Sequence, residues 1–341
     1  MIVEEFLIVF FVVNISLIIL FKFTKILLDN PSHGRHKNKV NQGIPLTGGS
    51  YFLICFLLIF FFENSEIISN IYFVFFVLIF ILGILSDSYK NITPSLRLLI
   101  QLLIISSSVY FLEININKTS LFFLDYFISN NIINIFFTIF CLLVLLNGSN
   151  FCDGINLNVI GYYLFVFIGL LFLNKNSSEN INLILIILCL SIFYISNFFN
   201  QSFLGDNGVY LISLFSGIYV INFINIQNSL NPLIAINLLW YPAYENLFSI
   251  IRKIKNKKSA LNPDNYHLHQ LILIYLKKKF KNIKIANSLT GCSINIYNFF
   301  IFSLATIDYS NTKYQLILSF FSLIIYNVLY ISLKQNFKNN L

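Results

Sequence analysis

Long apolar runs separated by short polar connections recur along almost the whole chain. Runs such as 6–20, 71–85 and 316–333 approach the roughly 20 apolar residues that a helix needs to cross a bilayer. Because hydrocarbon offers the backbone no water, each run must close its own hydrogen bonds, which favours helices. The alternating pattern of a membrane barrel is absent from the sequence. The pattern therefore predicts an all-α, polytopic integral membrane protein with about 11 transmembrane helices, at residues 4–28, 48–62, 71–85, 95–112, 132–149, 157–173, 181–199, 207–225, 232–251, 287–307 and 314–334.

The positions of the basic residues orient these spans. The chain has 341 residues, of which 57% are hydrophobic and 11% charged, and its formal net charge is +8. With the N-terminus outside and the C-terminus cytoplasmic, only Lys118, Lys175 and Lys313 of the 22 basic residues fall outside, as the positive-inside rule requires. Topology thus explains the charge better than nucleic-acid binding does, because no basic segment interleaved with aromatic residues is present.

Five of the seven aspartates lie at or beside the ends of apolar runs, all on the predicted cytoplasmic side. A carboxylate close to hydrocarbon is costly, so such residues usually serve a function. We expect residues 1–341 to form one integral membrane domain whose active site is built from the cytoplasmic connections. These connections are residues 29–47, 86–95, 147–157, 199–206 and 252–286, and the five aspartates are Asp29, Asp87, Asp153, Asp206 and Asp264.

The first two connections combine carboxylates with cations. The first carries Arg35 and Lys37. A basic loop attracted to anionic lipid is its plain alternative explanation. In the second, Asp87 follows a span and Arg97 lies in the first turn of the next. An arginine that anchors the interface by pairing with a carboxylate would explain this pattern as well.

The other connections add amides, a further carboxylate and imidazoles. Asn147, Asn150 and Asp153 recur at every third residue where an apolar run ends. Asp206 begins a span, where a carboxylate can hold a hard cation or simply cap the helix. His267 and His269 are two residues apart, which suits phosphate contacts better than zinc.

Five motifs follow one another in these connections. They are Asp-x-Pro with Gly-Gly at 29–49, Gly-x-x-x-Asp with Arg and Gln at 83–101, Asn-x-x-Asn-x-x-Asp-Gly at 147–154, Phe-x-Gly-Asp-x-Gly at 203–208, and Pro-Asp with His-x-His at 263–269.

This ordered set resembles the polyprenyl-phosphate N-acetylhexosamine-1-phosphate transferases, glycosyltransferase family 4, which include WecA-like, MraY-like and TagO-like enzymes. The similarity spans nearly the whole chain. Gln270 follows His269, so the longer histidine cluster of the peptidoglycan enzymes is missing, which favours the WecA-like branch.

The resemblance implies a reaction and its partners. The enzyme would transfer N-acetylhexosamine-1-phosphate from a UDP-sugar such as UDP-GlcNAc to polyprenyl (undecaprenyl) phosphate and release UMP. This step would begin a lipid intermediate of cell-surface polysaccharide, such as the O-antigen of lipopolysaccharide or a cell-wall polymer, in the bacterial inner membrane. Mg²⁺ would be the cofactor, with Mn²⁺ as a substitute, and a homodimer is left open.

The same resemblance implies roles for single residues. Asp206 and Asp87 would hold the metal, and Phe203 would stack on uracil. The expected catalytic residues are Asp87, Asp153, His267 and His269, and the expected substrate-binding residues are Asn150, Phe203, Arg97, Lys37, Arg35 and Asn147.

Three positions depart from the family's pattern. Ser86 stands where the family usually has the first of two adjacent aspartates, and Leu157 stands where it usually has a second glycine. The proline usual before Gly205 is also missing. Two other hypotheses therefore remain open: a transporter or flippase for lipid phosphates, and a homologue whose catalysis Ser86 impairs.

Overall fold

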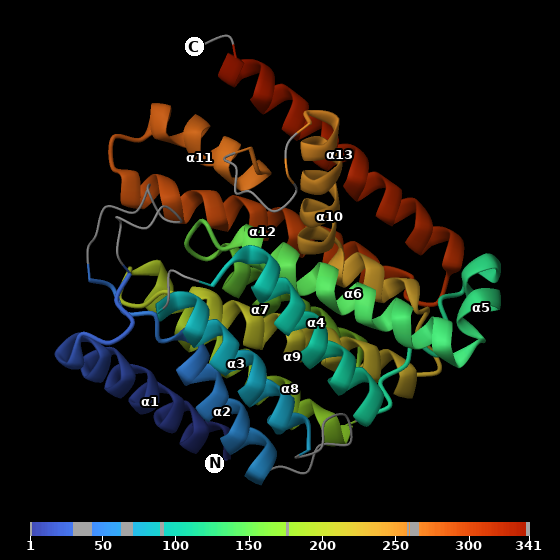
Figure 1. Cartoon of the computed structure of the whole chain (residues 1–341), viewed down its shortest axis with the longest axis horizontal. Coiled ribbons are helices and arrows are strands. Elements are labelled where there is room, and N and C mark those ends of the chain that lie inside the picture. The colour runs from blue at the N-terminus through green and yellow to red at the C-terminus, as the bar shows by residue number, and fades with distance from the viewer. Residues whose placement is uncertain are drawn as a thin grey trace.

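The computed structural model describes residues 2–29, 43–62, 71–88, 92–174, 177–257, 259 and 266–338. Within these residues it contains 13 α-helices and no β-strand (Figure 1). In chain order they are α1 (Ile2–Thr24), α2 (Gly48–Phe62), α3 (Tyr72–Ser88), α4 (Pro94–Phe111), α5 (Phe122–Ile128), α6 (Asn131–Cys152), α7 (Asn158–Leu173), α8 (Ser177–Phe198), α9 (Gly205–Ile226), α10 (Leu233–Lys255), α11 (Leu268–Lys279), α12 (Ile283–Ile307) and α13 (Thr312–Lys338).

Each of the 11 predicted spans corresponds to one helix, and α5 and α11 are additional. Seven described helices are long and apolar enough to cross a membrane, namely α1, α4, α6, α8, α9, α12 and α13, whereas α2, α3 and α7 are apolar but shorter. Helix α10 is continuous, but polar residues such as Asn237 and Glu245 interrupt its apolar sequence. The chain is therefore a multi-pass helical membrane protein, as predicted, and the number of crossings stays a prediction.

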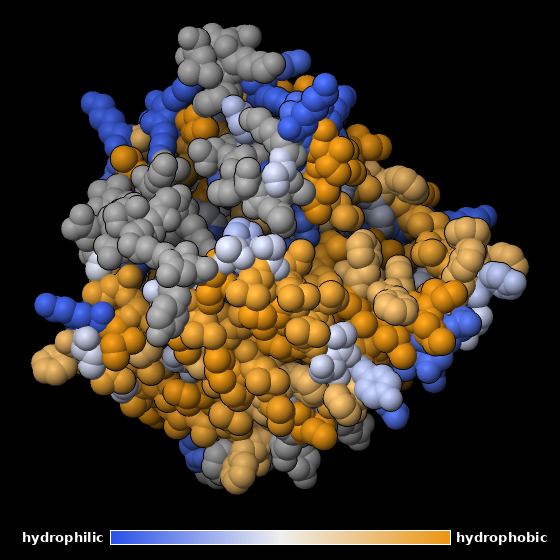
Figure 2. Space-filling model, viewed as in Figure 1, coloured by the Kyte–Doolittle hydropathy of each residue, from blue (hydrophilic) through white to orange (hydrophobic). Residues whose placement is uncertain are grey.

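The α9 helix forms the centre of the bundle. In its apolar stretch 78% of the residues are buried, against 17% for α1 and 22% for α13, which lie at opposite edges (Figure 1). The ring of Phe215 in α9 packs on Phe56 of α2, Phe76 of α3 and Phe167 of α7, with centroids 4.0, 5.6 and 5.7 Å away. The outer helices instead expose apolar side chains, which form the broad hydrophobic surface of Figure 2. Lipid is the natural solvent for such a surface.

Hydrogen bonds gather the predicted cytoplasmic helix ends at one end of the bundle. The bonds join the end of α3 to the start of α9, and the start of α7 to the end of α8 and the start of α12. The first set pairs Asp87 with Asp206 and Asn207. The second pairs Asn156 and Leu157 with Asn197, and Asn156 with Asn287. In addition, Leu28 and Phe203 both pair with Pro45, just before α2.

The predicted outside connections meet one another in the same way. Asn225 bonds to residues 115 and 117, and Gln227 bonds to Asn174. Asn231 bonds to the connection between α12 and α13. The two sets of connections therefore occupy different ends of the molecule, as the sequence predicts.

Two glycines allow α2 and α3 to pack directly against the start of α9. A Cβ atom at Gly83 would lie 2.3 Å from the Cα of Asn207, and one at Gly49 would lie 2.4 Å from its Oδ1. The Gly49 amide donates to that oxygen at 2.7 Å. The sequence predicts a close approach at Gly49, and the structure identifies its partner as α9.

Candidate active site

Asp206 lies in the first turn of α9 and links three helices. Its side chain is 4% exposed, and it follows Gly205, whose φ of +69° favours glycine. Its Oδ2 accepts hydrogen bonds from the Ser86 hydroxyl at the end of α3 (2.6 Å) and from the Arg97 guanidinium in α4 (3.3 Å). The Tyr210 hydroxyl donates to the same oxygen at 3.3 Å. One carboxylate oxygen thus gathers polar groups that are far apart in the sequence.

Asp87 caps the start of α9 from the end of α3. Its Oδ1 accepts the backbone N–H of Asp206 at 3.0 Å. Its Oδ2 accepts the backbone N–H of Asn207 at 3.0 Å and the side-chain amide of Asn207 at 2.6 Å. Since helix starts carry unpaired N–H groups, a carboxylate there is stabilising. The observed contacts make Asp87 a capping residue, and its catalytic and metal-binding roles stay predictions.

The pair Asp87 and Asp206 concentrates negative charge just beyond the apolar stretch 71–85. Burial and the Asp206 carboxylate raise the pKa of Asp87 to about 7, although its N–H donors act in the opposite direction. Arg97 lies 3.3 Å from Asp206 and offsets part of this charge. Binding of a cation or a proton by this pair of carboxylates is therefore favourable.

The carboxylates of Asp206 and Asp87 can hold magnesium only if the substrate supplies further ligands. Among the described residues there is no group of three or more His, Cys, Asp or Glu side chains that could hold a metal. Mg²⁺, however, is usually bound by one or two carboxylates together with substrate phosphates and water. Asp206, beside Asp87, meets that smaller requirement.

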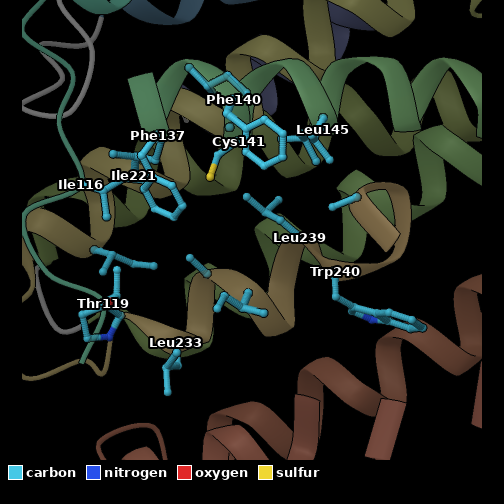
Figure 3. Close-up of a pocket in the computed structure, with 18 of the residues that line it drawn as sticks. Ile116, Thr119, Phe137, Phe140, Cys141, Leu145, Ile221, Leu233, Leu239 and Trp240 are labelled. Atoms are coloured by element: carbon cyan, nitrogen blue, oxygen red, sulfur yellow. The ribbon is translucent and has the colours of Figure 1, made fainter. Parts of the chain in front are cut away.

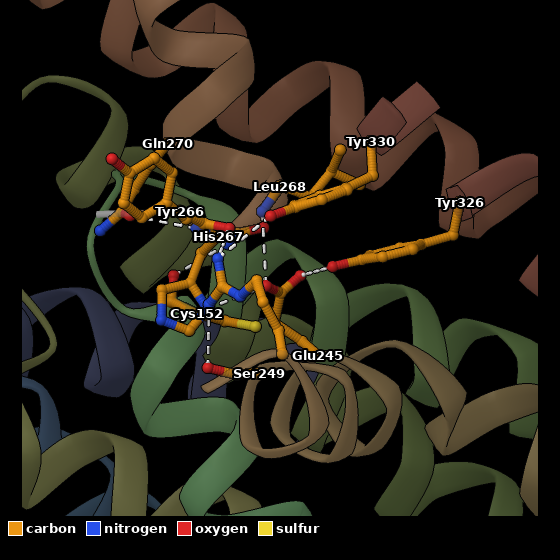
Figure 4. Close-up of polar contacts among 11 residues, drawn as sticks. Cys152, Glu245, Ser249, Tyr266, His267, Leu268, Gln270, Tyr326 and Tyr330 are labelled. Carbon is orange, nitrogen blue, oxygen red and sulfur yellow. Dashed lines mark hydrogen bonds and ion pairs between the residues drawn. The ribbon is translucent and has the colours of Figure 1, made fainter. Parts of the chain in front are cut away.

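A second polar cluster joins α6, α10, α11 and α13 (Figure 4). His267 is the N-cap residue of α11, and its Nδ1 lies 2.9 Å from Oε1 of Glu245 in α10. The Tyr326 hydroxyl donates to Glu245 Oε2 at 2.6 Å. The ring of Phe151, in the last turn of α6, lies 5.4 Å from that of His267.

His269 is fully buried beside His267. The two rings are nearly parallel, with centroids 5.5 Å apart, and neither nitrogen of His269 has a hydrogen-bond partner among the described residues. Burial, followed by the charge of His267, lowers the pKa of His269 to about 3, so its imidazole is neutral. A Cβ atom at Gly154 would lie 3.0 Å from Nε2, which places the turn after Asp153 against the histidine motif.

The remaining predicted residues occupy different settings. Asn147 donates to the Leu143 carbonyl of its own helix at 3.0 Å, whereas Asn150 and Asp153 are half-buried at the end of α6. Phe203 is 2% exposed in a small cluster with Ile44 and Leu46, so stacking on uracil would require its ring to leave that cluster. Arg35, Lys37 and Asp264 lie outside the described residues.

Two residues of these clusters were not predicted. Asn207 is fully buried and joins α2, α3 and α9, although it occupies a variable position of the Phe-x-Gly-Asp-x-Gly motif. Glu245 is the lone carboxylate inside the predicted span 232–251. An ionisable residue within an apolar span is itself a signal of function, and that signal could have identified it.

A comparison with known families finds a match for part of the chain. Residues 69–236 match the model of glycosyl transferase family 4, and this segment contains Ser86, Asp87, Arg97 and Asp206 but not the histidine motif. No curated protein matches the chain. The match supports a transferase of the glycosyl-phosphate kind. Residues 69–236 are thus similar to glycosyl transferase family 4, and the chain around them has a multi-pass helical architecture.

Proposed function

We propose that this protein transfers N-acetylhexosamine-1-phosphate from a UDP-sugar to a polyprenyl phosphate, such as undecaprenyl phosphate, and releases UMP. The observation that carries the proposal is the cluster of Asp206, Asp87, Ser86 and Arg97 where the apolar helices end. One reactant is a water-soluble anion and the other is a lipid phosphate confined to the headgroup plane. A charged cluster at that plane can meet both. The product would be the first lipid-linked intermediate of a cell-surface polysaccharide in a bacterial inner membrane.

Phosphoryl transfer needs positioning and charge neutralisation more than covalent help from the protein. An oxygen of the lipid phosphate attacks the β-phosphorus of the UDP-sugar. The bond from that phosphorus to the bridging oxygen breaks, and UMP leaves with the oxygen. Arg97 can bind phosphate oxygens in a bidentate manner, because its guanidinium already lies at the cluster. Mg²⁺, held by Asp206, supplies positive charge to the pyrophosphate when it is bound.

The histidine cluster supports a polar ligand at the same end of the bundle. A buried polar atom without a partner is rare in proteins, and His269 has two such nitrogens. Its neutral imidazole can donate one hydrogen bond and accept another. Sugar hydroxyls and phosphate oxygens both suit that pattern.

An apolar pocket of about 270 Å³ supports a lipid acceptor. It lies between α6, α9 and α10, and Figure 3 shows Phe137 and Phe140 on the side opposite Leu239. Phe140 and Ile236, which line it, are 53% and 47% exposed on the lipid-facing surface. An isoprenoid chain matches this lining in polarity.

Release of UMP tests the proposal. Purified protein with UDP-GlcNAc, undecaprenyl phosphate and Mg²⁺ should release UMP, and Asp206→Asn should abolish the release. Asp308→Asn is a matched control, because Asp308 follows α12 in the connection at the other end. Full activity of Asp206→Asn would contradict the metal assignment, and lipid movement without UMP release would favour a transporter. A mass spectrum of the lipid product from several UDP-sugars identifies the amino sugar.

A further inference from the structure

Glu245 is a buried carboxylate of α10 that is bonded on both oxygens to other elements. Oε1 lies 2.9 Å from His267 Nδ1 and accepts the backbone N–H of Leu268 at 3.3 Å. Oε2 accepts the Tyr326 hydroxyl at 2.6 Å. The side chain is 1% exposed. These contacts fix the carboxylate between the start of α11 and the middle of α13 (Figure 4).

Packing alone gives no reason for a carboxylate at this place. Burying a charged group is costly unless it is paired and hydrogen-bonded, and a well-packed apolar side chain is often at least as stable there. The neighbours of Glu245 on α10, such as Leu238 and Tyr241, show that apolar and aromatic side chains fit this part of the helix. The carboxylate therefore needs an explanation in terms of its partner, His267.

The contact with Glu245 decides which nitrogen of His267 carries a proton. A carboxylate only accepts hydrogen bonds, so Nδ1 must be the donor in the neutral ring and in the imidazolium alike. Any substrate contact of the ring then goes through Nε2. Two rings also pack beside that of His267: Phe151, tilted by 40° with its centroid 5.4 Å away, and the nearly parallel His269 at 5.5 Å, so the ring's orientation is restricted.

Resting on the proposed transferase function, we propose that Glu245 is a positioning residue that keeps a proton on Nδ1 of His267. When a substrate phosphate binds, Nε2 takes up a proton from solvent, and the resulting N–H donates a hydrogen bond to a phosphate oxygen. The positive charge of the imidazolium lies between the carboxylate and the phosphate. Tyr326 in turn holds the carboxylate in place. The same logic governs histidines that are oriented by a carboxylate in other enzymes and metal sites.

Other ionisable groups near His267 also influence its protonation. Lys253 of α10 lies over the Phe151 ring, and Arg252 contacts the backbone of Tyr266. His269 lies on α11, and Asp153 ends α6. Glu245 contacts the imidazole directly, with 2.9 Å between Oε1 and Nδ1, so its removal is the informative change.

The first test follows the proton directly and does not depend on turnover. Nitrogen NMR of the full chain in nanodiscs, with labelled histidine, distinguishes the two ring nitrogens, and His267→Ala identifies the signal among the four histidines. We expect a protonated Nδ1 in the neutral ring of the wild type, and a shift toward protonated Nε2 in Glu245→Gln. A wild-type ring protonated on Nε2 alone would overturn the proposal.

The second test is a double-mutant cycle on the rate of UMP release. Glu245→Gln should lower kcat/KM about 10- to 100-fold, a typical effect of losing a positioning partner. Tyr326→Phe should give a smaller loss. In the His267→Ala background, Glu245→Gln should change kcat/KM less than about 2-fold, because its effect passes through His267. Equal losses in both backgrounds would overturn the proposal.

A pH series and a matched variant separate positioning from folding. The loss in Glu245→Gln should shrink at lower pH, since protonation from solvent restores the imidazolium, and a merely structural defect would not recover. Asn246→Ala removes one buried hydrogen bond from the next residue of α10 to the Val144 carbonyl. It should lower thermal stability but leave the pH profile unchanged. If the wild type releases no UMP, the transferase proposal fails, and the NMR result alone decides the role of Glu245.

Discussion

Leu157, the residue before α7, has a left-handed backbone conformation with φ of +68°. This conformation costs a residue with a Cβ atom roughly 1–2 kcal/mol. The peptide is held there because its N–H donates to Asn197 and its carbonyl accepts from Asn295. The related family has glycine at this position, and the backbone supplies the physical reason. The leucine side chain, 1% exposed, offsets the strain by burial.

Leu157→Gly and Leu157→Ala should therefore differ in a predictable direction. Both variants lose the buried side chain, at about 2–5 kcal/mol. Glycine also relieves the left-handed strain, so Leu157→Gly should be the more stable of the two by about 1 kcal/mol. Thermal unfolding in one detergent measures the difference. A more stable alanine variant would show that the strain is absent.

The residue at position 86 lies close enough to Asp206 for its charge to matter. Its hydroxyl lies 2.6 Å from Asp206 Oδ2, so Ser86→Asp would place a further carboxylate beside the pair with Asp87. We expect this variant to unfold at a lower temperature than wild type without metal, and to gain more stability from Mg²⁺. Ser86→Ala, the control, removes the bond to Asp206 and the one accepted from Arg97, and should lose about 1–2 kcal/mol. An Mg²⁺ response no larger than that of the wild type would contradict metal binding here.

The length of an apolar run is enough to locate the helices whose sequence is continuously apolar. It does not locate α5 and α11. The α5 helix has only seven residues, and the apolar part of α11 is short, with His269 and Gln270 near its start and three lysines at its end. Helix α11 buries Leu268, Leu271 and Leu273 against α12 and α13, so it is amphipathic. Recognising it requires the helical period instead of the length of a run.

The candidate site shows the same limit. Asp206 and Arg97 could be predicted because each stands out at the end of an apolar run. The capping role of Asp87 could not, since it depends on the start of α9, 119 residues later. The role proposed for Glu245 depends on its contact with His267, which is 22 residues away at the start of another helix. Contacts of this kind follow from how helices pack, which the pattern along one chain does not fix.

Packing between helices depends on a few glycines, and this gives a prediction for α3 and α9. Gly83→Ala would place a Cβ atom 2.3 Å from the backbone of Asn207, which cannot move without displacing α9. We expect a loss of about 3 kcal/mol or more, at the upper end for overpacked cores, or failure to fold. Gly169→Ala is the control, because its Cβ atom would meet the end of the Leu238 side chain at 3.3 Å and Cβ of Phe302 at an ordinary 3.9 Å. Yield and thermal stability of the two purified variants measure the contrast.

For the whole molecule, the separation of polar networks into two ends has a consequence for orientation. Lys278 on α11 belongs to the end that carries the carboxylate and histidine clusters. Lys313, at the start of α13, belongs to the other end. Both side chains are exposed, so cysteines at these positions can report the side of the membrane on which each end lies.

In intact cells, a thiol reagent that cannot cross membranes should label Lys313→Cys, and should label Lys278→Cys only after the membrane is opened. The unmodified chain is the background, because Cys55, Cys152 and Cys189 are buried and the two other cysteines are half-buried. The proposed donor, a nucleotide sugar, is too polar to cross the bilayer unaided. Labelling of Lys278→Cys from outside would place the clusters where this donor cannot reach them, and the transferase proposal would then fail regardless of how well the site is built.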